Sequence, residues 1–177
     1  PTAPRVLAVR VLGACCALGV SDGIAFLGGP DLVTIDAREP APWPVERGTL
    51  AVDSPVIEVD GDRAYFGSVV DGLIVVDLTG TGEPIVVGRL ADLPVRGLTA
   101  YGARAFATVA DAVVALDVEA AVDPVEIGRL VYPDVTGPIA KEGCTLYAVV
   151  GDKRVIVVDA NDPTRLVLRG TLDLPGD

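Results

Sequence analysis

Short apolar runs, each ending in an aspartate, recur along the chain at nearly regular intervals. The clearest run covers residues 73–77 (LIVVD), and its counterparts are residues 32–36, 113–117 and 155–159. The aspartates that end these runs, at positions 36, 77, 117 and 159, lie 41, 40 and 42 residues apart. A fixed period of about forty residues predicts a repeat architecture, in which each unit packs against its neighbours.

One repeat reads clearly between residues 53 and 90, where short apolar runs alternate with clusters of Gly, Pro and Asp. Runs of this length bounded by turn formers predict strands at residues 55–59, 63–68, 73–77 and 85–90. The third of these strands is apolar on both faces, so we expect it to be the buried centre of the unit. Between the first two strands, Asp60, Gly61 and Asp62 predict a tight hairpin turn.

Other landmarks of the repeat recur in the same register. Glycines at positions 61, 102 and 143 each precede an aromatic residue by four positions, and a Gly-x-Leu element closes every unit. The aromatic residues, predicted to lie in the core, are Phe26, Tyr65, Phe106 and Tyr147, and the closing glycines are Gly48, Gly88, Gly128 and Gly170. Four strands in about forty residues are typical of a propeller blade. We therefore predict an all-β protein, a β-propeller built from four four-stranded blades.

The same landmarks predict a single propeller domain or propeller fragment over residues 1–177, with repeats at 13–50, 51–90, 91–130 and 131–172. Residues 1–12 stand in the register of a last strand and predict the outer strand of a preceding blade. Two arrangements of the blades stay open. One is an open arc, completed by another chain or by sequence outside these residues. The other is a compact four-bladed ring, in which Cys144 would lie near Cys15 and Cys16; all three are otherwise expected to be small buried residues.

The strand at residues 73–77 and the segment 155–177 resemble the LVIVD-repeat family. That segment reads VIVVDANDP and, after two residues, LVLRGTLDLPG. The resemblance covers nearly the whole chain, although the first repeat departs from it with Cys15 and Cys16, and Ala115 replaces a β-branched residue in the third. It implies a propeller of the bacterial and archaeal surface or exported proteins, mostly without an assigned activity. An extracytoplasmic location, at the cell surface, in the periplasm or secreted, is therefore what the resemblance implies.

Composition narrows the classes of partner and chemistry. The net charge of −11 disfavours nucleic acid and anionic membrane surfaces. The longest uncharged stretch, residues 11–21, falls well short of the roughly 20 residues of a membrane helix, so no transmembrane segment is predicted. The absence of histidine removes the commonest general base and metal ligand, which favours a non-catalytic protein over an enzyme.

Aspartates at turns are the candidate ligand-binding residues, because the loops before the first and the third strand of each blade lie on the same face of a propeller. Their carboxylates suit a hard cation such as Ca²⁺ or a basic partner. The alternative interpretation is that they form turns by accepting hydrogen bonds from nearby backbone amides. No segment has the dense Asp-Gly spacing of a calcium loop, so Ca²⁺ has no defined site and no other cofactor is expected. The residues are Asp31, Asp71, Asp111 and Asp152 before the third strands and Asp53, Asp92 and Asp134 before the first strands.

Two further features complete the candidate chemistry. Trp43 lies between two prolines and either contacts a sugar or peptide or packs against the first blade. The strand-ending aspartates are expected to accept hydrogen bonds from the loop that follows, and no catalytic residue is predicted. The sequence thus favours a non-catalytic protein-interaction or scaffold module that binds a protein partner or self-associates through open blade edges. The alternative is a propeller enzyme, or a ligand- or cation-binding domain, that uses the acidic loop face.

Overall fold

The structure is a computed structural model that describes residues 17–21, 24–28, 32–36, 45–50, 56–79 and 84–175. These residues form sixteen strands and no helix, so nothing in the described part is a candidate for a membrane-crossing helix. The strand predicted at residues 1–12 lies outside the described residues, as do Cys15 and Cys16.

The strands form four antiparallel sheets, each a meander in chain order, here called blades 1 to 4. Blade 1 consists of β1 (Ala17–Ser21), β2 (Ile24–Gly28), β3 (Leu32–Asp36) and β4 (Val45–Leu50). Blade 2 consists of β5 (Val56–Asp60), β6 (Arg63–Ser68), β7 (Gly72–Asp77) and β8 (Ile85–Leu90). Blade 3 consists of β9 (Gly97–Tyr101), β10 (Arg104–Val109), β11 (Ala112–Asp117) and β12 (Val125–Val131). Blade 4 consists of β13 (Val135–Glu142), β14 (Thr145–Val150), β15 (Arg154–Asp159) and β16 (Val167–Asp173).

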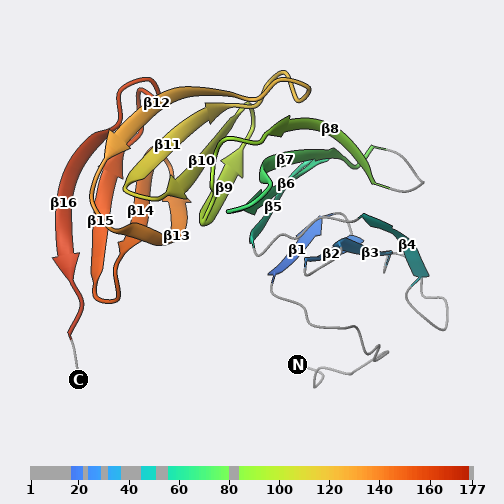
Figure 1. Cartoon of the computed structure of the whole chain (residues 1–177), viewed down its shortest axis with the longest axis horizontal. Helices are drawn as coiled ribbons and strands as arrows, with labels where there is room; N and C mark the ends of the chain where they lie inside the picture. The colour runs from blue at the N-terminus through green and yellow to red at the C-terminus, as the bar shows by residue number, and fades with distance from the viewer. Residues whose placement is uncertain are drawn as a thin grey trace, which may run out of the picture.

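The four blades fan out into an arc (Figure 1). The first strands, β1, β5, β9 and β13, lie along its inner side, where consecutive ones contact each other. The last strands, β4, β8, β12 and β16, lie along its outer rim. Blades 1 and 4 form the two ends, which border an open side of the molecule. The predicted all-β, four-stranded blades are confirmed, and of the two arrangements the structure has the open arc.

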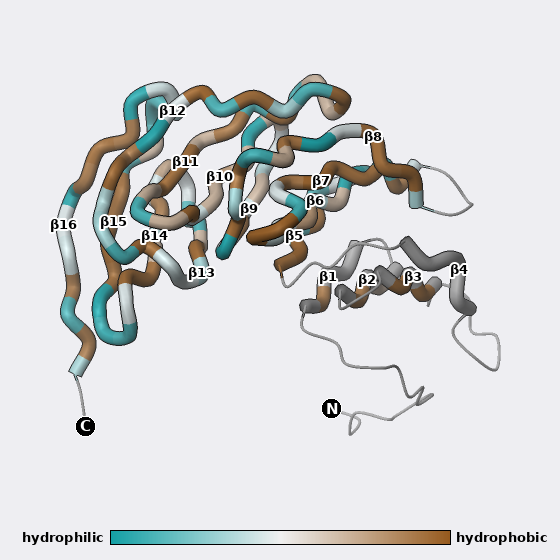
Figure 2. The backbone as a smooth tube through the Cα atoms, viewed as in Figure 1, coloured by the Kyte–Doolittle hydropathy of each residue, from teal (hydrophilic) through white to brown (hydrophobic). Residues whose placement is uncertain are grey.

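Blade 2 follows the predicted pattern of strands closely. Its third strand, β7, is buried along its length: Leu73, Ile74, Val75 and Val76 are at most 1% exposed, which confirms it as the centre of the blade. Hydrophobic stretches coincide with the strands and hydrophilic ones with many of the turns (Figure 2). The recurring glycine of the first turn is explained by Gly61, whose φ of 57° is in the left-handed region that favours glycine.

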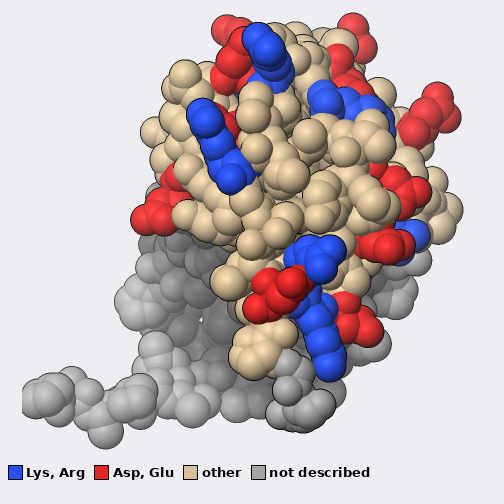
Figure 3. Space-filling model, turned by 90° about the vertical axis from the view of Figure 1, so that its left-hand side faces the viewer, with Lys and Arg blue, Asp and Glu red and all other residues tan. Residues whose placement is uncertain are grey.

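The side of the molecule on which blade 4 lies carries small groups of basic and acidic residues separated by broad uncharged areas (Figure 3). Arg154 Nε lies 2.6 Å from Asp173 Oδ1, and Arg169 pairs with Asp159. These pairs are solvent-exposed and contribute little to stability. The broad uncharged areas between the charged groups are therefore the main feature of this side.

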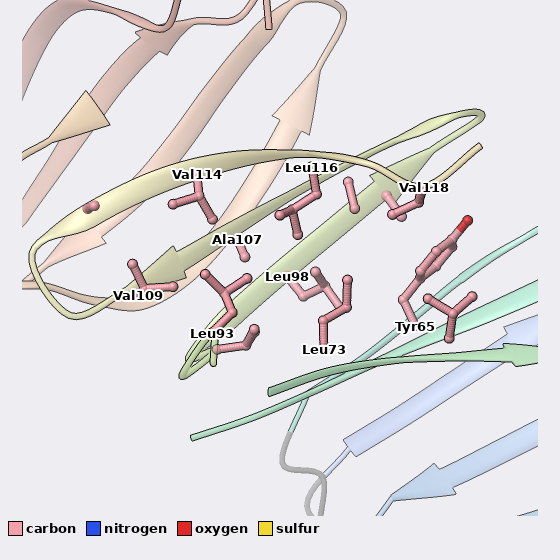
Figure 4. Close-up of a cluster of buried hydrophobic side chains, with 14 residues drawn as sticks. Tyr65, Leu73, Leu93, Leu98, Ala107, Val109, Val114, Leu116 and Val118 are labelled. Carbon is pink, nitrogen blue, oxygen red and sulfur yellow. The ribbon is translucent and has the colours of Figure 1, made fainter. Parts of the chain in front are cut away.

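The two faces of a blade have different neighbours. In blade 2, Tyr65 and Leu73 point toward blade 3 and pack against Leu98, Val114 and Leu116 in a cluster of buried side chains (Figure 4). We call the side of a blade that faces the next blade its forward face, and the other side its backward face.

The next interface repeats this arrangement. On blade 3, Phe106 and Val113 lie on the forward face and pack against Leu146 and Ile156 of blade 4. Successive blades therefore meet forward face to backward face.

Candidate interaction surface

The aspartates predicted as ligand-binding residues are partly described. Asp71, Asp92, Asp111, Asp134 and Asp152 all lie in loops on one face of the arc, at the third-strand and first-strand turns. The remaining candidates, Asp31, Asp53 and Trp43, lie outside the described residues.

Among the described candidates, Asp111 and Asp134 are joined by a hydrogen bond. The backbone N–H of Asp134 donates to Asp111 Oδ1 at 3.0 Å, and the Asp134 carbonyl accepts from the N–H of Gly151 at 3.0 Å. Both aspartates have a positive φ, 62° and 61°. Within the described ranges, no three or more carboxylate or thiol groups gather closely enough to hold a metal ion. The contacts seen here are those of turn-forming residues.

A hollow of about 410 Å³ lies beside Asp134, on blade 4. Its lining includes Lys153, Arg154 and Asp173, and Arg154 Nε donates to Asp173 Oδ1 at 2.6 Å. Acidic and basic side chains balance each other in this hollow. It therefore offers no strong field for a charged ligand.

The strand-ending aspartates have the structural role expected from the sequence. Asp77 Oδ1 accepts from the N–H of Thr79 at 2.8 Å, and Asp117 Oδ1 accepts from the N–H of Glu119 at 3.0 Å. In blade 4, Asp159 Oδ1 accepts from the backbone two residues on, at 2.8 Å. The hydrogen bonds from the backbone and side chain of Thr79 lower the pKa of Asp77. These carboxylates stabilise loops, and the prediction is confirmed for all three.

The forward face of blade 4 is exposed, whereas the forward faces of blades 2 and 3 are buried. Tyr65 and Phe106 are 1% and 3% exposed, which confirms them as core residues, whereas Tyr147 at the same position of the repeat is 37% exposed. The prediction that Tyr147 lies in the core is wrong because no described strand covers this face. The side chain of Phe26 lies outside the described part.

Neighbouring positions on the same face behave in the same way. Leu172 pairs with Val155 across β15 and β16 and is 59% exposed. Its counterparts Leu90 and Leu130 pack against the clusters between blades. Val157, beside Tyr147 in the sheet, is only partly buried. We call Tyr147, Val155, Val157 and Leu172 the end face of blade 4.

The recurring glycine of the fourth strand shows what a forward face normally receives. A Cβ at Gly88 would lie 1.7 Å from the carbonyl oxygen of Ala121, and one at Gly128 would lie 2.0 Å from that of Pro163. Both carbonyls belong to the loop between the third and fourth strands of the next blade. At Gly170 a Cβ would meet no atom of the described residues within 4 Å. Blade 4 therefore keeps the glycine at this position, but no loop of the described residues occupies the space beside it.

Sequence reasoning misplaced Cys144 and did not single out the end face. Cys144, expected to be buried, is an exposed free thiol in the turn after β13, next to Gly143. The register contained a signal for Cys144, since Gly143 marks a turn.

Comparison with known proteins identifies the architecture and nothing narrower. No protein-family model and no curated protein matches the chain. The crystal structure of BamB from Moraxella catarrhalis matches it with a TM-score of 0.64 at 16% sequence identity. The fold is a β-propeller. The match covers 89% of this chain and 52% of that one, so the chain spans about half the length of the propeller structure it resembles.

Proposed function

We propose that this chain is a non-catalytic protein-interaction or scaffold module of LVIVD-type blades, and that the end face of blade 4 binds its protein partner. The observation that carries the proposal is the exposure of Tyr147 and Leu172, 37% and 59%, at positions that elsewhere pack against a blade. A contiguous exposed apolar surface is typical of an interaction site. The balanced hollow near Asp134 and the turn-forming aspartates supply no comparable argument for catalysis.

The proposal includes a location outside the cytoplasm, at the cell surface, in the periplasm or in the medium. The resemblance to LVIVD repeats, for which residues 155–177 are the best match, supports this location. Fractionation of the source cells, with detection of the chain by antibody, tests it. Recovery with the cytoplasmic fraction alone contradicts it.

Photocrosslinking at the end face tests the interaction. A benzoylphenylalanine residue replaces Tyr147 in one variant, and in the matched control it replaces Tyr101, which is 69% exposed on blade 3 and lies off the end face. We expect irradiation of the source cells to give a protein adduct for the first variant and not for the second. A folded Tyr147 variant that forms no protein adduct contradicts the proposal.

A further inference from the structure

We propose that the turn between β13 and β14 of blade 4 binds the carboxylate group of a small organic acid. The donors are the backbone N–H groups of Lys141 and Gly143, and the ammonium of Lys141 supplies a positive charge. The site faces blade 3, so the inference goes beyond the proposed function and does not depend on what contacts the end face. It is carried by a comparison with the same place between blades 2 and 3, where the chain's own carboxylates bind these donors.

Between blades 2 and 3, the inner strand of one blade bonds to the inner strand of the next through carboxylates. Asp60, at the end of β5, accepts a hydrogen bond from the backbone N–H of Gly102. Glu58, on the same face of β5, accepts one from the backbone N–H of Ala100. Alternate N–H groups of an antiparallel strand point away from its partner in the sheet. The free edge of β9 therefore binds two carboxylate groups.

Blade 4 has the same pair of donors. Lys141 and Gly143 stand at the positions of Ala100 and Gly102, and the two hairpins have the same register there. Gly143 also has the conformation of Gly102, with φ values of 57° and 59°. A Cβ on Gly143 would meet no atom of the described residues within 4 Å, so the space beside the turn is open. The two N–H groups of blade 4 therefore have the orientation of those that bind carboxylates in blade 3.

The carboxylates are replaced at the interface between blades 3 and 4. Thr99 and Tyr101 of blade 3 stand where blade 2 has Glu58 and Asp60, so a hydroxyl and a phenol take the place of two acids. Within the part of the chain that the structure describes, no side chain accepts a hydrogen bond from the two N–H groups of blade 4. These donors are therefore available to an acceptor from outside the chain.

Lys141 changes the charge of this place in the direction that suits an anion. Its counterpart in blade 3 is Ala100, so a cation is present at the interface that lacks the two acids. Its Nζ lies 4.5 Å from the centroid of the Tyr101 ring, which holds the ammonium beside the turn. The side chain of Glu142 is directed to the other face of β13, because successive side chains of a strand alternate. An ammonium and two N–H groups together form charge-assisted hydrogen bonds with a carboxylate.

The size of the ligand follows from the position of β9. This strand contacts β13 along the inner side of the arc (Figure 1), so it already lies where an added peptide strand would have to pair. A ligand therefore reaches the donors end on, past the ring of Tyr101, which is 69% exposed. Such access suits a small organic acid and does not suit an extended peptide.

Amide chemical shifts of the purified full chain test the proposal, with acetate as the probe. Titration with sodium acetate, compared with sodium chloride at equal ionic strength, should move the amide resonances of Lys141 and Gly143 along a saturable curve. The amide of Gly102 is the internal control and should not move, because Asp60 already binds it. No saturable shift at Gly143, or an equal shift with chloride, overturns the proposal.

Three variants separate the site from general binding of anions. Tyr101→Asp gives blade 3 the acid that blade 2 has at Asp60, and it should abolish the acetate response at Gly143 with unchanged circular dichroism. Lys141→Gln keeps the backbone donors and should raise the apparent Kd about two- to fivefold, the effect of one exposed charge. Lys153→Gln is its matched control, because Lys153 is an exposed lysine at the other end of the strands of blade 4, and it should leave the Kd unchanged. An acetate response that is the same in all three variants shows an adventitious ion only and overturns the site.

Discussion

The interface between blades 2 and 3 and the end face of blade 4 are two outcomes of one repeat. Tyr65 and Leu73 in the interface are at most 1% exposed, whereas Tyr147 at the end face is 37% exposed and Val155 is only partly buried. The residue types are nearly the same, so the difference comes from the neighbour and not from the blade. Each blade of such an array relies on the next one to bury its apolar face.

The interfaces between blades 2 and 3 and between blades 3 and 4 differ in their hydrogen bonds more than in their apolar contacts. Between blades 2 and 3, Arg63 Nη1 donates to the carbonyl oxygen of Val118 at 2.6 Å. Between blades 3 and 4, Thr108 Oγ1 donates to the Gly137 carbonyl oxygen at 2.7 Å, a different residue pair at a different place. The apolar pattern is thus shared by these two interfaces, whereas these two hydrogen bonds differ between them.

Truncating the recurring aromatic residue should give the largest difference in lost stability between an interior interface and the end face. Phe106→Ala leaves a cavity at a position that is 3% exposed, and we expect a loss of about 3–5 kcal/mol of unfolding free energy. Tyr147→Ala removes a partly exposed ring, and we expect a loss of about 1 kcal/mol or less. Urea unfolding measures both, in a Leu172→Asp background so that self-association does not contribute. Equal losses would contradict the assignment of Tyr147 to an uncovered face.

Adding one methyl group at the recurring glycine should destabilise the fold at Gly128 and stabilise it slightly at Gly170. Gly128→Ala places a Cβ 2.0 Å from the Pro163 carbonyl oxygen, so blade 4 must shift, at a cost of about 1–3 kcal/mol or more. Gly170→Ala meets no described atom within 4 Å and removes a flexible residue from a strand, so a gain of about 0.5 kcal/mol is expected. The same unfolding measurement in the same background applies. If Gly170→Ala lowers the free energy of unfolding as much as Gly128→Ala does, the space beside Gly170 is already occupied within one chain.

The contrast between these glycines also shows what sequence reasoning could and could not reach. The forty-residue period and the strand at residues 73–77 were sufficient for the blades, because alternation and turn residues are local properties. Exposure of Tyr147 depends on which blade lies next to it, and the register is the same for an arc and for a ring. The reason for Gly88 likewise needed the position of the Ala121 carbonyl, which is 33 residues away and in another blade.

The inner strands offer a third and smaller comparison. Glu58 on β5 lies opposite Tyr65, the recurring aromatic residue of blade 2. The same position is Thr99 in blade 3, which is buried, and Ala140 in blade 4, which is exposed. Burial raises the pKa of Glu58, and the negative charge of nearby Asp60 raises it further. The backbone N–H of Ala100 in the next blade donates a hydrogen bond to the carboxylate, which lowers the pKa and partly offsets the increase. The neighbouring blade therefore both desolvates this carboxylate and bonds to it.

A pH series on Glu58→Gln measures the balance. A carboxyl group whose folded pKa is raised stabilises the fold fully below its unfolded value of 4.5, and this contribution is lost as the pH rises through the folded pKa. The free energy of unfolding of Glu58→Gln relative to wild type should therefore increase between about pH 4 and about pH 7. The matched control is Ala140→Glu, which puts a carboxylate at the same position of a blade with no described neighbour on that side, and it should carry no such penalty at neutral pH. If the relative stability of Glu58→Gln is the same at both pH values, the carboxylate is not desolvated by blade 3, and the inner strands do not share the contrast seen between the interior and the end face.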